Sequence, residues 1–326
     1  MPYAVLLQSP GGPERLVWQQ APISHLKPGE ARVRQTAIGV NFIDIYHRTG
    51  LYPLPFYPHG LGMEAAGVVE ETGEGVSEFT PGDRVAYTLR MPGAYAEECM
   101  VEARRLVRIP GEVSDAQAAA VMMKGLTARY LLRQSFPVKR GDHVLIHAAS
   151  GGVGLLLTQW AAQLGATVIG TVSTEKKEAL ARQHGAAHVI LYTQEKVSAR
   201  VREITGGQGV DVVYDSVGQP TFMDSLDALK PLGLMVSFGQ SGGKVAPLDI
   251  GVLAQKGSLF LTRPMLWDYM QDAETYRQAA EEVLGMVAED KLAVHIDRTL
   301  PLSQAADAHR LLESRQTTGA VVLVAG

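Results

Sequence analysis

The stretch Asp142–Gly154 reads DHVLIHAASGGVG, and it decides the fold of the chain. Its first half, Asp142–His147, is a short apolar run that predicts a buried strand. The glycines of Ala149-x-Gly151-x-x-Gly154 follow at once, and Val153–Leu164 continues with a helical pattern. Glycines between a strand and a helix let the backbone approach a ligand, and the helix N-terminus attracts an anion. The stretch therefore predicts a cradle for the pyrophosphate of a nucleotide.

A tight turn that binds nothing could carry the same glycines, but the sequence downstream favours the nucleotide site. Strand patterns recur at Ala166–Ser173, His188–Tyr192, Val210–Ser216, Gly233–Gly239 and Ser258–Thr262, and helical patterns lie around Glu175–His184, Glu195–Thr205 and Thr221–Leu229. Alternating strands and helices imply right-handed crossovers between parallel strands. We predict an α/β fold with a doubly wound six-stranded parallel sheet, a Rossmann fold, and a ligand at the carboxyl ends of its strands.

The residues before this region have a different sequence pattern, with short strands and many turns, and this pattern predicts a second domain. Short strand patterns at Tyr3–Leu7, Ala31–Val40, Ala65–Thr72 and Arg84–Thr88 are separated by turns rich in Gly and Pro, as in a mainly β barrel or sandwich. Ser114 is a plausible N-cap for a long helix that leads to the glycine stretch.

The residues after Thr262 have no core of their own. Helical patterns at Tyr269–Glu289 and Ser303–Ser314 and a strand pattern at Ala320–Val324 most simply return to the first domain. We therefore predict a nucleotide-binding domain, residues 123–264, inserted between the two parts of a catalytic domain, residues 1–122 and 265–326. The cleft between them is the expected substrate site.

Composition narrows the class of protein. A net charge of −4 gives no general attraction to nucleic acid or to an anionic membrane surface. The only cysteine, Cys99, excludes an internal disulfide and fits a reducing compartment. The N-terminal residues lack the pattern of a signal peptide, and the most apolar window, Val153–Val172, divides into a helix and a strand. We expect a cytoplasmic protein that acts on a small molecule and binds neither membranes nor nucleic acid.

Seven motifs, taken in their order along the chain, resemble those of one known family. They are Gly39–Asp44 (GVNFID), Gly50–Pro53 (GLYP), Gly62–Gly67 (GMEAAG), Lys124–Thr127 (KGLT), Ala148–Gly154, Tyr214–Gly218 (YDSVG) and Ser237–Gly239 (SFG). Together they resemble the medium-chain dehydrogenase/reductase superfamily and, within it, the zinc-free, zeta-crystallin-type quinone oxidoreductases. The resemblance implies a chaperonin-10-like catalytic domain, NADPH as cofactor, a quinone or other electron-poor acceptor, and a homodimer.

The same resemblance implies the residues that bind the cofactor. Asn41, Phe42 and Tyr46 would line the nicotinamide side, with Tyr130 nearby, and Gly152 and Val153 would meet the pyrophosphate. Phe238, Gly239 and Ser241 would lie along the last strand ends, with Arg263 just beyond them, and Ser173, Lys177, Tyr192 and Arg315 would bind the 2′-phosphate. The cofactor is also expected to contact Thr127, Gly151, Gly154, Thr174 and Ser216. For the aromatic side chains, packing in a core is the alternative interpretation.

The residues after the second strand of the predicted sheet indicate which nicotinamide cofactor binds. NAD-binding sheets usually carry an acid there, on the ribose hydroxyls, but Thr171–Thr174 contains none. Lys176 and Lys177 follow, and a cation suits the 2′-phosphate of NADPH. Glu175 then belongs to the first turn of the next helix, and the lysines could alternatively be only a solvated face.

We expect no metal. Zinc enzymes of the superfamily have a Cys at the position of Asn41 and a His at that of Met63, and Asn and Met are poor ligands for Zn²⁺. Glu64 would then be a carboxylate that lines the cleft or lies just behind the residues that line it, and it would assist no metal ligand.

Without a Lewis acid, an acceptor that delocalises charge is favoured, so the first hypothesis is quinone reduction by NADPH. Asn41 would be the hydrogen-bonding group, and Tyr46 and Tyr52 would be donors or stacking faces for the acceptor. Reduction of an activated C=C bond is a close alternative. An NADPH-binding sensory or structural protein is a distant one. The apolar run Ser258–Thr262 would be the exposed edge strand through which two copies pair.

Overall fold

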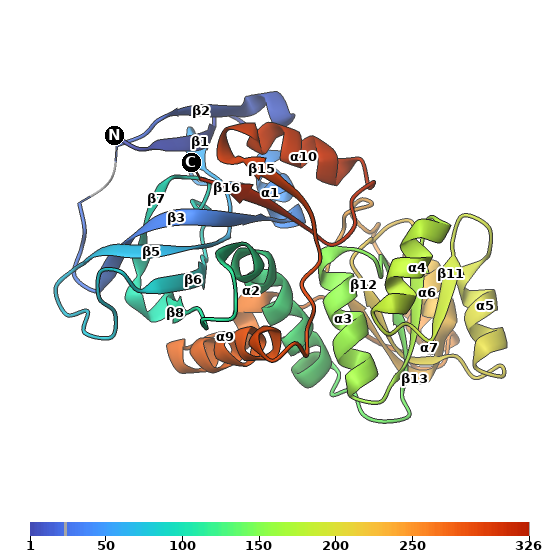
Figure 1. Cartoon of the computed structure of the whole chain (residues 1–326). Helices are drawn as coiled ribbons and strands as arrows, with labels where there is room; N and C mark the ends of the chain where they lie inside the picture. Colours follow the sequence, from blue (N-terminus) through green and yellow to red (C-terminus); the bar gives the residue numbers. More distant parts are fainter. Residues whose placement is uncertain (23–24, 326) are drawn as a thin grey trace. The chain divides into compact units, whose positions relative to one another are not determined.

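The structure, a computed structural model, describes residues 1–22 and 25–325 and divides into two compact units (Figure 1). Unit 1 comprises Met1–Leu126 together with Met270 and the residues after it, and unit 2 comprises Thr127–Tyr269. Unit 1 has two sheets and unit 2 has one, and each unit has its own apolar core. None of the described helices is long and apolar enough to cross a membrane.

Unit 2 contains the predicted six-stranded parallel sheet. Its strand order is β11-β10-β9-β12-β13-β14. Strands β10 and β11 thus lie on one side of β9, and β12, β13 and β14 lie on the other. The strands are β9 (His143–Ile146), β10 (Thr167–Val172), β11 (His188–Leu191), β12 (Val210–Asp215), β13 (Leu229–Ser237) and β14 (Phe260–Thr262). All five pairings are parallel. This confirms the doubly wound Rossmann fold.

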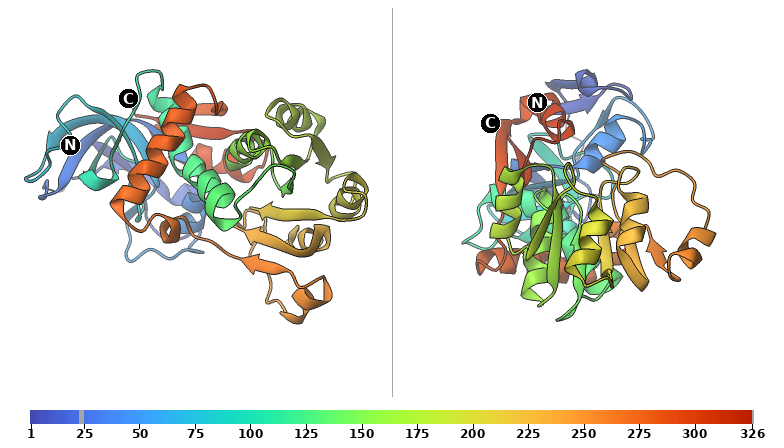
Figure 2. Two further views of the ribbon diagram at one scale, coloured as in Figure 1. Left: turned by 90° about the horizontal axis from the view of Figure 1, so that it is seen from below. Right: turned by 90° about the vertical axis from the view of Figure 1, so that its right-hand side faces the viewer.

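Helices cover both faces of this sheet (Figure 2). The helices of unit 2 are α3 (Gly152–Gln163), α4 (Glu175–Gln183), α5 (Val197–Ile204), α6 (Phe222–Ala228), α7 (Gly251–Gln255) and α8 (Leu266–Tyr269), with a π-helical turn at Leu131–Ser135. Right-handed crossovers place α3 and α4 on one face and α5 and α6 on the other. Because α3 and α6 leave the sheet on opposite faces, the carboxyl ends of β9 and β12 form the switch point where such sheets bind ligands.

Unit 1 is mainly β and contains two sheets. One has the order β15-β16-β3-β5-β6-β8, with β7 also paired to β3, and the other has the order β2-β1-β4. The strands are β1 (Tyr3–Leu7), β2 (Leu16–Gln20), β3 (Glu30–Val40), β4 (His59–Gly60), β5 (Glu64–Thr72), β6 (Arg84–Thr88), β7 (Glu98–Glu102), β8 (Val107–Arg108), β15 (Ile296–Pro301) and β16 (Ala320–Val324). β16 runs antiparallel to β3, so the C-terminal segment completes the N-terminal sheet.

Four helices accompany these sheets: α1 (Phe42–Arg48), α2 (Asp115–Tyr130), α9 (Ala273–Ala288) and α10 (Ala305–Glu313). Ser114 caps α2 as predicted, because its Oγ accepts from the backbone N–H of Gln117 at 3.2 Å, while Gln117 Oε1 accepts from the backbone N–H of Ser114 at 3.0 Å. The sequence did not predict α1, which contains only seven residues and directly continues an 11-residue strand.

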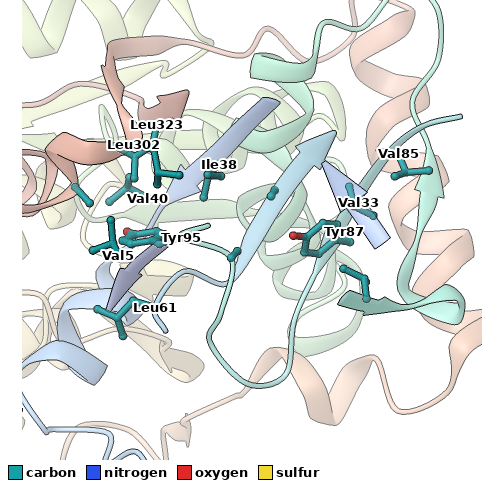
Figure 3. Packing of buried hydrophobic residues seen from close by; sticks show 14 of the residues in the cluster. Val5, Val33, Ile38, Val40, Leu61, Val85, Tyr87, Tyr95, Leu302 and Leu323 are labelled. Atoms are coloured by element: carbon teal, nitrogen blue, oxygen red, sulfur yellow. The ribbon is translucent and has the colours of Figure 1, made fainter. Parts of the chain in front are cut away.

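The core of unit 1 is an apolar cluster in which two tyrosines are almost wholly buried. Tyr95 lies near Val5, Val40 and Leu61, whereas Tyr87 lies at another part of the cluster, near Val33 and Val85 (Figure 3). Buried tyrosine hydroxyls need hydrogen-bond partners. Tyr87 donates to Gln35 at 2.7 Å, and Tyr95 contacts residues next to the candidate site described below.

Candidate active site

The glycine stretch forms a sharp turn at the carboxyl end of β9. Ala148 has a φ of 51°, in the left-handed region, and α3 begins at Gly152 with Gly151 as its N-cap. Gly151 has no side chain to cap the helix, so the first backbone N–H groups of α3 remain available to a ligand. The local geometry is that of an anion cradle.

Gly154 shows why this turn requires glycine. A Cβ at this position would lie 2.2 Å from the carbonyl oxygen of Ala148 and 2.9 Å from the Cα of Ala149. Real Cβ atoms essentially never approach backbone so closely, so the turn and the first turn of α3 pack without room for a side chain. The cradle therefore fits the pyrophosphate of a dinucleotide.

Ser173, Thr174, Lys177 and Tyr192 lie at the carboxyl ends of β10 and β11. Thr174 is the N-cap of α4, and its Oγ1 accepts from the backbone N–H of Lys177 at 3.3 Å. Glu175 is the first residue of α4, where a carboxylate suits the helix dipole. Tyr192 follows β11 with its side chain about half exposed. These residues form a group without an acid at the strand end.

The loops after β12 and β13 are tied together. Asp215 is fully buried and accepts hydrogen bonds from the backbone N–H groups of Val217 (2.7 Å) and Gly218 (3.0 Å). The carbonyl oxygen of Ser216 accepts from the N–H (3.0 Å) and the hydroxyl (3.2 Å) of Ser241. These contacts bring Ser216 and Ser241 together at the carboxyl edge.

Phe238, Gly239 and Arg263 belong to the same edge. The backbone N–H of Phe238 donates to the carbonyl of Asp215 at 2.9 Å, and a Cβ on Gly239 would meet the carbonyl oxygen of Ser216 at 2.6 Å. Arg263, just after β14, donates to the carbonyl of Ser237 at 2.8 Å. The structure thus brings together the residues that the sequence assigned to the last strand ends.

Tyr130 is packed and not open to solvent. It is 2% exposed, and its ring stacks on that of Tyr269 with centroids 4.5 Å apart. Burial raises the pKa of its hydroxyl, so it stays protonated at neutral pH. Thr127, another residue expected to contact the cofactor, lies three residues earlier on α2. Tyr130 is therefore part of a packed aromatic pair with Tyr269.

In unit 1, Asn41 belongs to a buried polar cluster with Glu64 and Lys124. Asn41 is the N-cap of α1, and its Nδ2 donates to Glu64 Oε1 at 2.7 Å. The Lys124 ammonium donates to the same oxygen at 2.8 Å, and the backbone N–H of Met123 donates to Glu64 Oε2 at 2.6 Å. Glu64 is fully buried, and its two oxygens accept hydrogen bonds from these three donors.

The cluster exists because a glycine makes room for it. A Cβ on Gly39 would lie 2.2 Å from Glu64 Oε1. The sequence named Gly39 and Lys124 only within motifs, and the role of Lys124 as the charge partner of Glu64 was missed. The signal that could have found it is a lysine in an otherwise apolar helix, since a buried lysine requires a carboxylate nearby.

Three aromatic side chains lie beside Asn41 in the sequence and pack on one another. The rings of Phe42 and Tyr46 are 6.4 Å apart, and those of Tyr46 and Tyr52 meet edge to face at 5.3 Å. His47 also packs its ring against Tyr52, and burial lowers the pKa of His47. Arg315 follows α10 with a φ of 58°, in unit 1, whereas Ser173, Lys177 and Tyr192 are in unit 2.

Comparisons with known proteins now place the chain in a family. Residues 27–132 match the alcohol dehydrogenase GroES-like domain, and residues 184–323 match the zinc-binding dehydrogenase model. The quinone oxidoreductase of Pseudomonas aeruginosa is 48% identical over 96% of this chain and 97% of its own length. The chain belongs to the quinone oxidoreductase family of medium-chain dehydrogenases/reductases.

Two further relatives of this quinone oxidoreductase family member are informative. A 2-haloacrylate reductase of Burkholderia is 45% identical over 99% of each chain. A solved structure of the Escherichia coli quinone oxidoreductase in complex with NADPH matches with a TM-score of 0.97 and 44% identity, covering 99% of each chain. The architecture described above is thus that of the family.

One of the two matching models is described as a zinc-binding dehydrogenase. Among the residues that the structure describes, no group of three or more His, Cys, Asp or Glu side chains could hold a metal ion. Met63 is buried, and the amide nitrogen of Asn41 donates to Glu64. The ammonium of Lys124 supplies the positive charge that Glu64 requires.

Proposed function

We propose that this protein reduces quinones with NADPH and without a metal ion. The observation that carries the proposal is the hydrogen-bonded cluster of Asn41, Glu64 and Lys124. The zinc enzymes of the superfamily have a Cys at the position of Asn41. The relatives named quinone oxidoreductase, at 45–48% identity over nearly the whole chain, support it. In this proposal unit 1 is the substrate domain and unit 2 binds the cofactor.

The cofactor would be held by residues of unit 2 with the required chemistry. Gly151–Gly154 would bind the pyrophosphate through the N-terminus of α3, and Ser173, Lys177 and Tyr192 would bind the 2′-phosphate. A carboxylate at the end of β10 would repel that phosphate, and none is present there. When bound, the reduced nicotinamide supplies a hydride equivalent to the acceptor.

The residues around Asn41 would stabilise the reduced acceptor. An amide nitrogen has two N–H groups, and since one donates to Glu64, the other can donate to an acceptor oxygen that becomes negative. Lys124 neutralises Glu64, so the buried carboxylate does not oppose that developing charge. Tyr46 and Tyr52 would contact the acceptor with ring faces or hydroxyls.

The test is NADPH consumption by purified, chelator-treated protein with 1,4-benzoquinone. We expect turnover with NADPH and little with NADH. Reduction of activated C=C bonds is the second candidate, favoured by the 45% identity to a 2-haloacrylate reductase, and 2-chloroacrylate tests it. Turnover of the acrylate alone would replace the quinone proposal. Tight NADPH binding without turnover of either acceptor would support a sensory or structural role and would refute both.

We expect the Asn41→Ala variant to lose activity with little loss of cofactor affinity. Removing one donor to a developing oxyanion lowers kcat by about 10²-fold, whereas the KM for NADPH should stay within about twofold. Steady-state kinetics with quinone measure both constants. Gln35→Ala, a buried amide removed from β3, is the matched control and should keep the wild-type kcat. An unchanged kcat in Asn41→Ala would contradict the assigned role.

We expect the Gly154→Ala variant to bind NADPH at least about tenfold more weakly, because the new Cβ must displace the turn at Ala148. Fluorescence titration with NADPH measures the dissociation constant. Gly285→Ala is the matched control, because a Cβ at Gly285, inside α9, meets nothing within 4 Å. Equal affinity in both variants would show that the tight packing at Gly154 has no part in cofactor binding.

We propose that two copies pair through β14, the outer strand of the unit 2 sheet. Phe260 and Leu261 are 60% and 38% exposed on this strand, and apolar edge strands are commonly covered by a second copy. We expect Phe260→Lys to shift the protein to a monomer in analytical ultracentrifugation. Met91→Lys, an equally exposed apolar position in unit 1, should leave the mass unchanged. A wild-type monomer at micromolar concentration would refute the dimer.

We also propose that the protein works in the cytoplasm and does not bind nucleic acid. The single Cys99 and the net charge of −4 support this. Cell fractionation with a tagged chain tests the location, and a shift of labelled RNA by the pure protein at physiological salt would refute the second statement.

A further inference from the structure

Asp44 is a buried carboxylate that holds the backbone of Asn41. Its Oδ2 accepts from the backbone N–H of Asn41 at 2.8 Å and from the hydroxyl of Tyr95 at 3.0 Å. The side chain is fully buried, and its other oxygen, Oδ1, has no hydrogen-bond partner among the described residues. Asn41 is thus fixed at two points, its backbone by Asp44 and its side chain by Glu64.

The hydrogen bonds continue from Tyr95 to α10, more than 200 residues away in the sequence. Tyr95 Oη lies 3.1 Å from His309 Nε2, and His309 Nδ1 lies 3.4 Å from Arg48 Nη1. The same guanidinium nitrogen donates to Glu313 at 3.0 Å. Tyr95, His309 and Arg48 are each at most 2% exposed, so water does not compete for these contacts.

The chemistry of these groups fixes the direction of every hydrogen bond. A guanidinium can only donate, so His309 Nδ1 must accept and the ring proton must reside on Nε2. That proton is donated to Tyr95 Oη, and the hydroxyl proton of Tyr95 is donated to Asp44. Burial lowers the pKa of His309 to about 3, which agrees with a neutral ring.

The direction of these hydrogen bonds decides between two roles for the chain that they form, a proton conduit and a positioning device. A proton conduit from the surface would have to pass through Arg48, which does not release a proton in proteins. The chain therefore carries no proton to the site. What it can do is hold Asp44, and through Asp44 the N-cap residue Asn41, in one geometry.

We propose that Asp44, Tyr95 and His309 are positioning residues for the reaction, acting through Asn41. The inference rests on the proposed function, since it assumes that Asn41 contacts the acceptor. A displacement of its amide would lower the rate of the chemical step and leave cofactor binding in unit 2 intact.

The chain offers a matched pair of variants for the test. Tyr95→Phe and Tyr87→Phe each delete one hydroxyl from a buried ring of the same core, but Tyr87 donates to Gln35 and not to the Asn41 region (Figure 3). We expect kcat for 1,4-benzoquinone to fall about tenfold in Tyr95→Phe and less than about twofold in Tyr87→Phe, with the KM for NADPH within about twofold in both. Equal effects on kcat would overturn the proposal.

The pH profile gives a readout that a merely structural role would not move. Asp44 is faced by Tyr95, Glu64 and Lys124, with His309 and Arg48 beyond Tyr95. Since the Tyr95 hydroxyl lowers the pKa of Asp44, its removal should shift the acid limb of kcat to higher pH. A limb at the same pH in wild type and Tyr95→Phe would count against the assignment.

Two variants of His309 check the proton assignment. The amide of His309→Gln can donate to Tyr95 as the Nε2–H does, so kcat should stay within about threefold of wild type. His309→Leu cannot donate and should resemble Tyr95→Phe. Equal loss in both variants would refute the donor role of Nε2.

Hydrogen-exchange mass spectrometry of peptides spanning residues 37–45 keeps this inference separate from the proposed function. Loss of amide protection in Tyr95→Phe but not in Tyr87→Phe supports the positioning chain even for a protein that does not turn over quinone. Unchanged protection in both variants overturns it even for an active enzyme.

Discussion

The Glu64→Ala variant is expected to lose about 3–5 kcal/mol of unfolding free energy, the largest loss we predict for a single substitution. Glu64 is fully buried, and its removal takes away the carboxylate that accepts from the Lys124 ammonium and from the N–H of Met123. An unpaired buried charge has neither water nor a counterion to stabilise it. Urea denaturation followed by circular dichroism measures the loss.

Two further variants sharpen this prediction. Glu70→Ala lies on the same strand but breaks only an exposed pair with Arg34, so it should cost at most about 1 kcal/mol. The double variant Glu64→Gln with Lys124→Met removes both buried charges and should recover most of the stability. A double variant as unstable as Glu64→Ala would mean that the shape of the glutamate, and not its charge, is what the core requires.

Asp44 is expected to make the protein less stable as the pH rises from about 4 to 7. Burial raises the pKa of this carboxyl from 3.8 to about 7, against the lowering effect of the Asn41 N–H and the Tyr95 hydroxyl. The folded state therefore keeps a proton that the unfolded state releases, so this contribution is fully present below pH 3.8 and lost as the pH passes 7. Three pKa units correspond to about 4 kcal/mol.

The difference between wild type and Asp44→Asn isolates this effect from other titrating groups. Asparagine cannot ionise, so the wild-type unfolding free energy should fall relative to that of the variant by about 4 kcal/mol between pH 4 and pH 7.5. Denaturation at five pH values in this range measures both curves. Parallel curves would show that Asp44 titrates in the native protein much as it does in the unfolded chain.

The nucleotide fold could be predicted because its signals are local. The apolar run of β9, the glycines after it and the alternation of strands and helices all lie within a few residues of the elements they specify. The strands β2, β4, β7, β8 and β15 were missed. They are short, half-exposed and without clear alternation, and pairing with distant strands determines them more than their own residues do.

The residues of the candidate site likewise fall into those that the sequence could predict and those that it could not. Asn41 and the glycine loop could be named from motifs. The partners Tyr95 and His309 could not, because they are 51 and 265 residues from Asp44 and no local pattern links them. Each alone is typical of an ordinary buried aromatic residue, and only the fold shows that they form one chain.

The pairing of β16 with β3 has a consequence for the order in which the protein folds during synthesis. Val321–Val324 pair with Ala37–Val40, the segment that leads directly to Asn41. Unit 2 is a continuous segment and is complete once Tyr269 has been made, whereas the sheet of unit 1 lacks an inner strand until residue 324 has left the ribosome. The nascent chain must therefore keep Ala37–Val40, at one end of the β3 edge, unpaired while more than 280 further residues are added, which is an exposure that chaperones recognise and that favours aggregation.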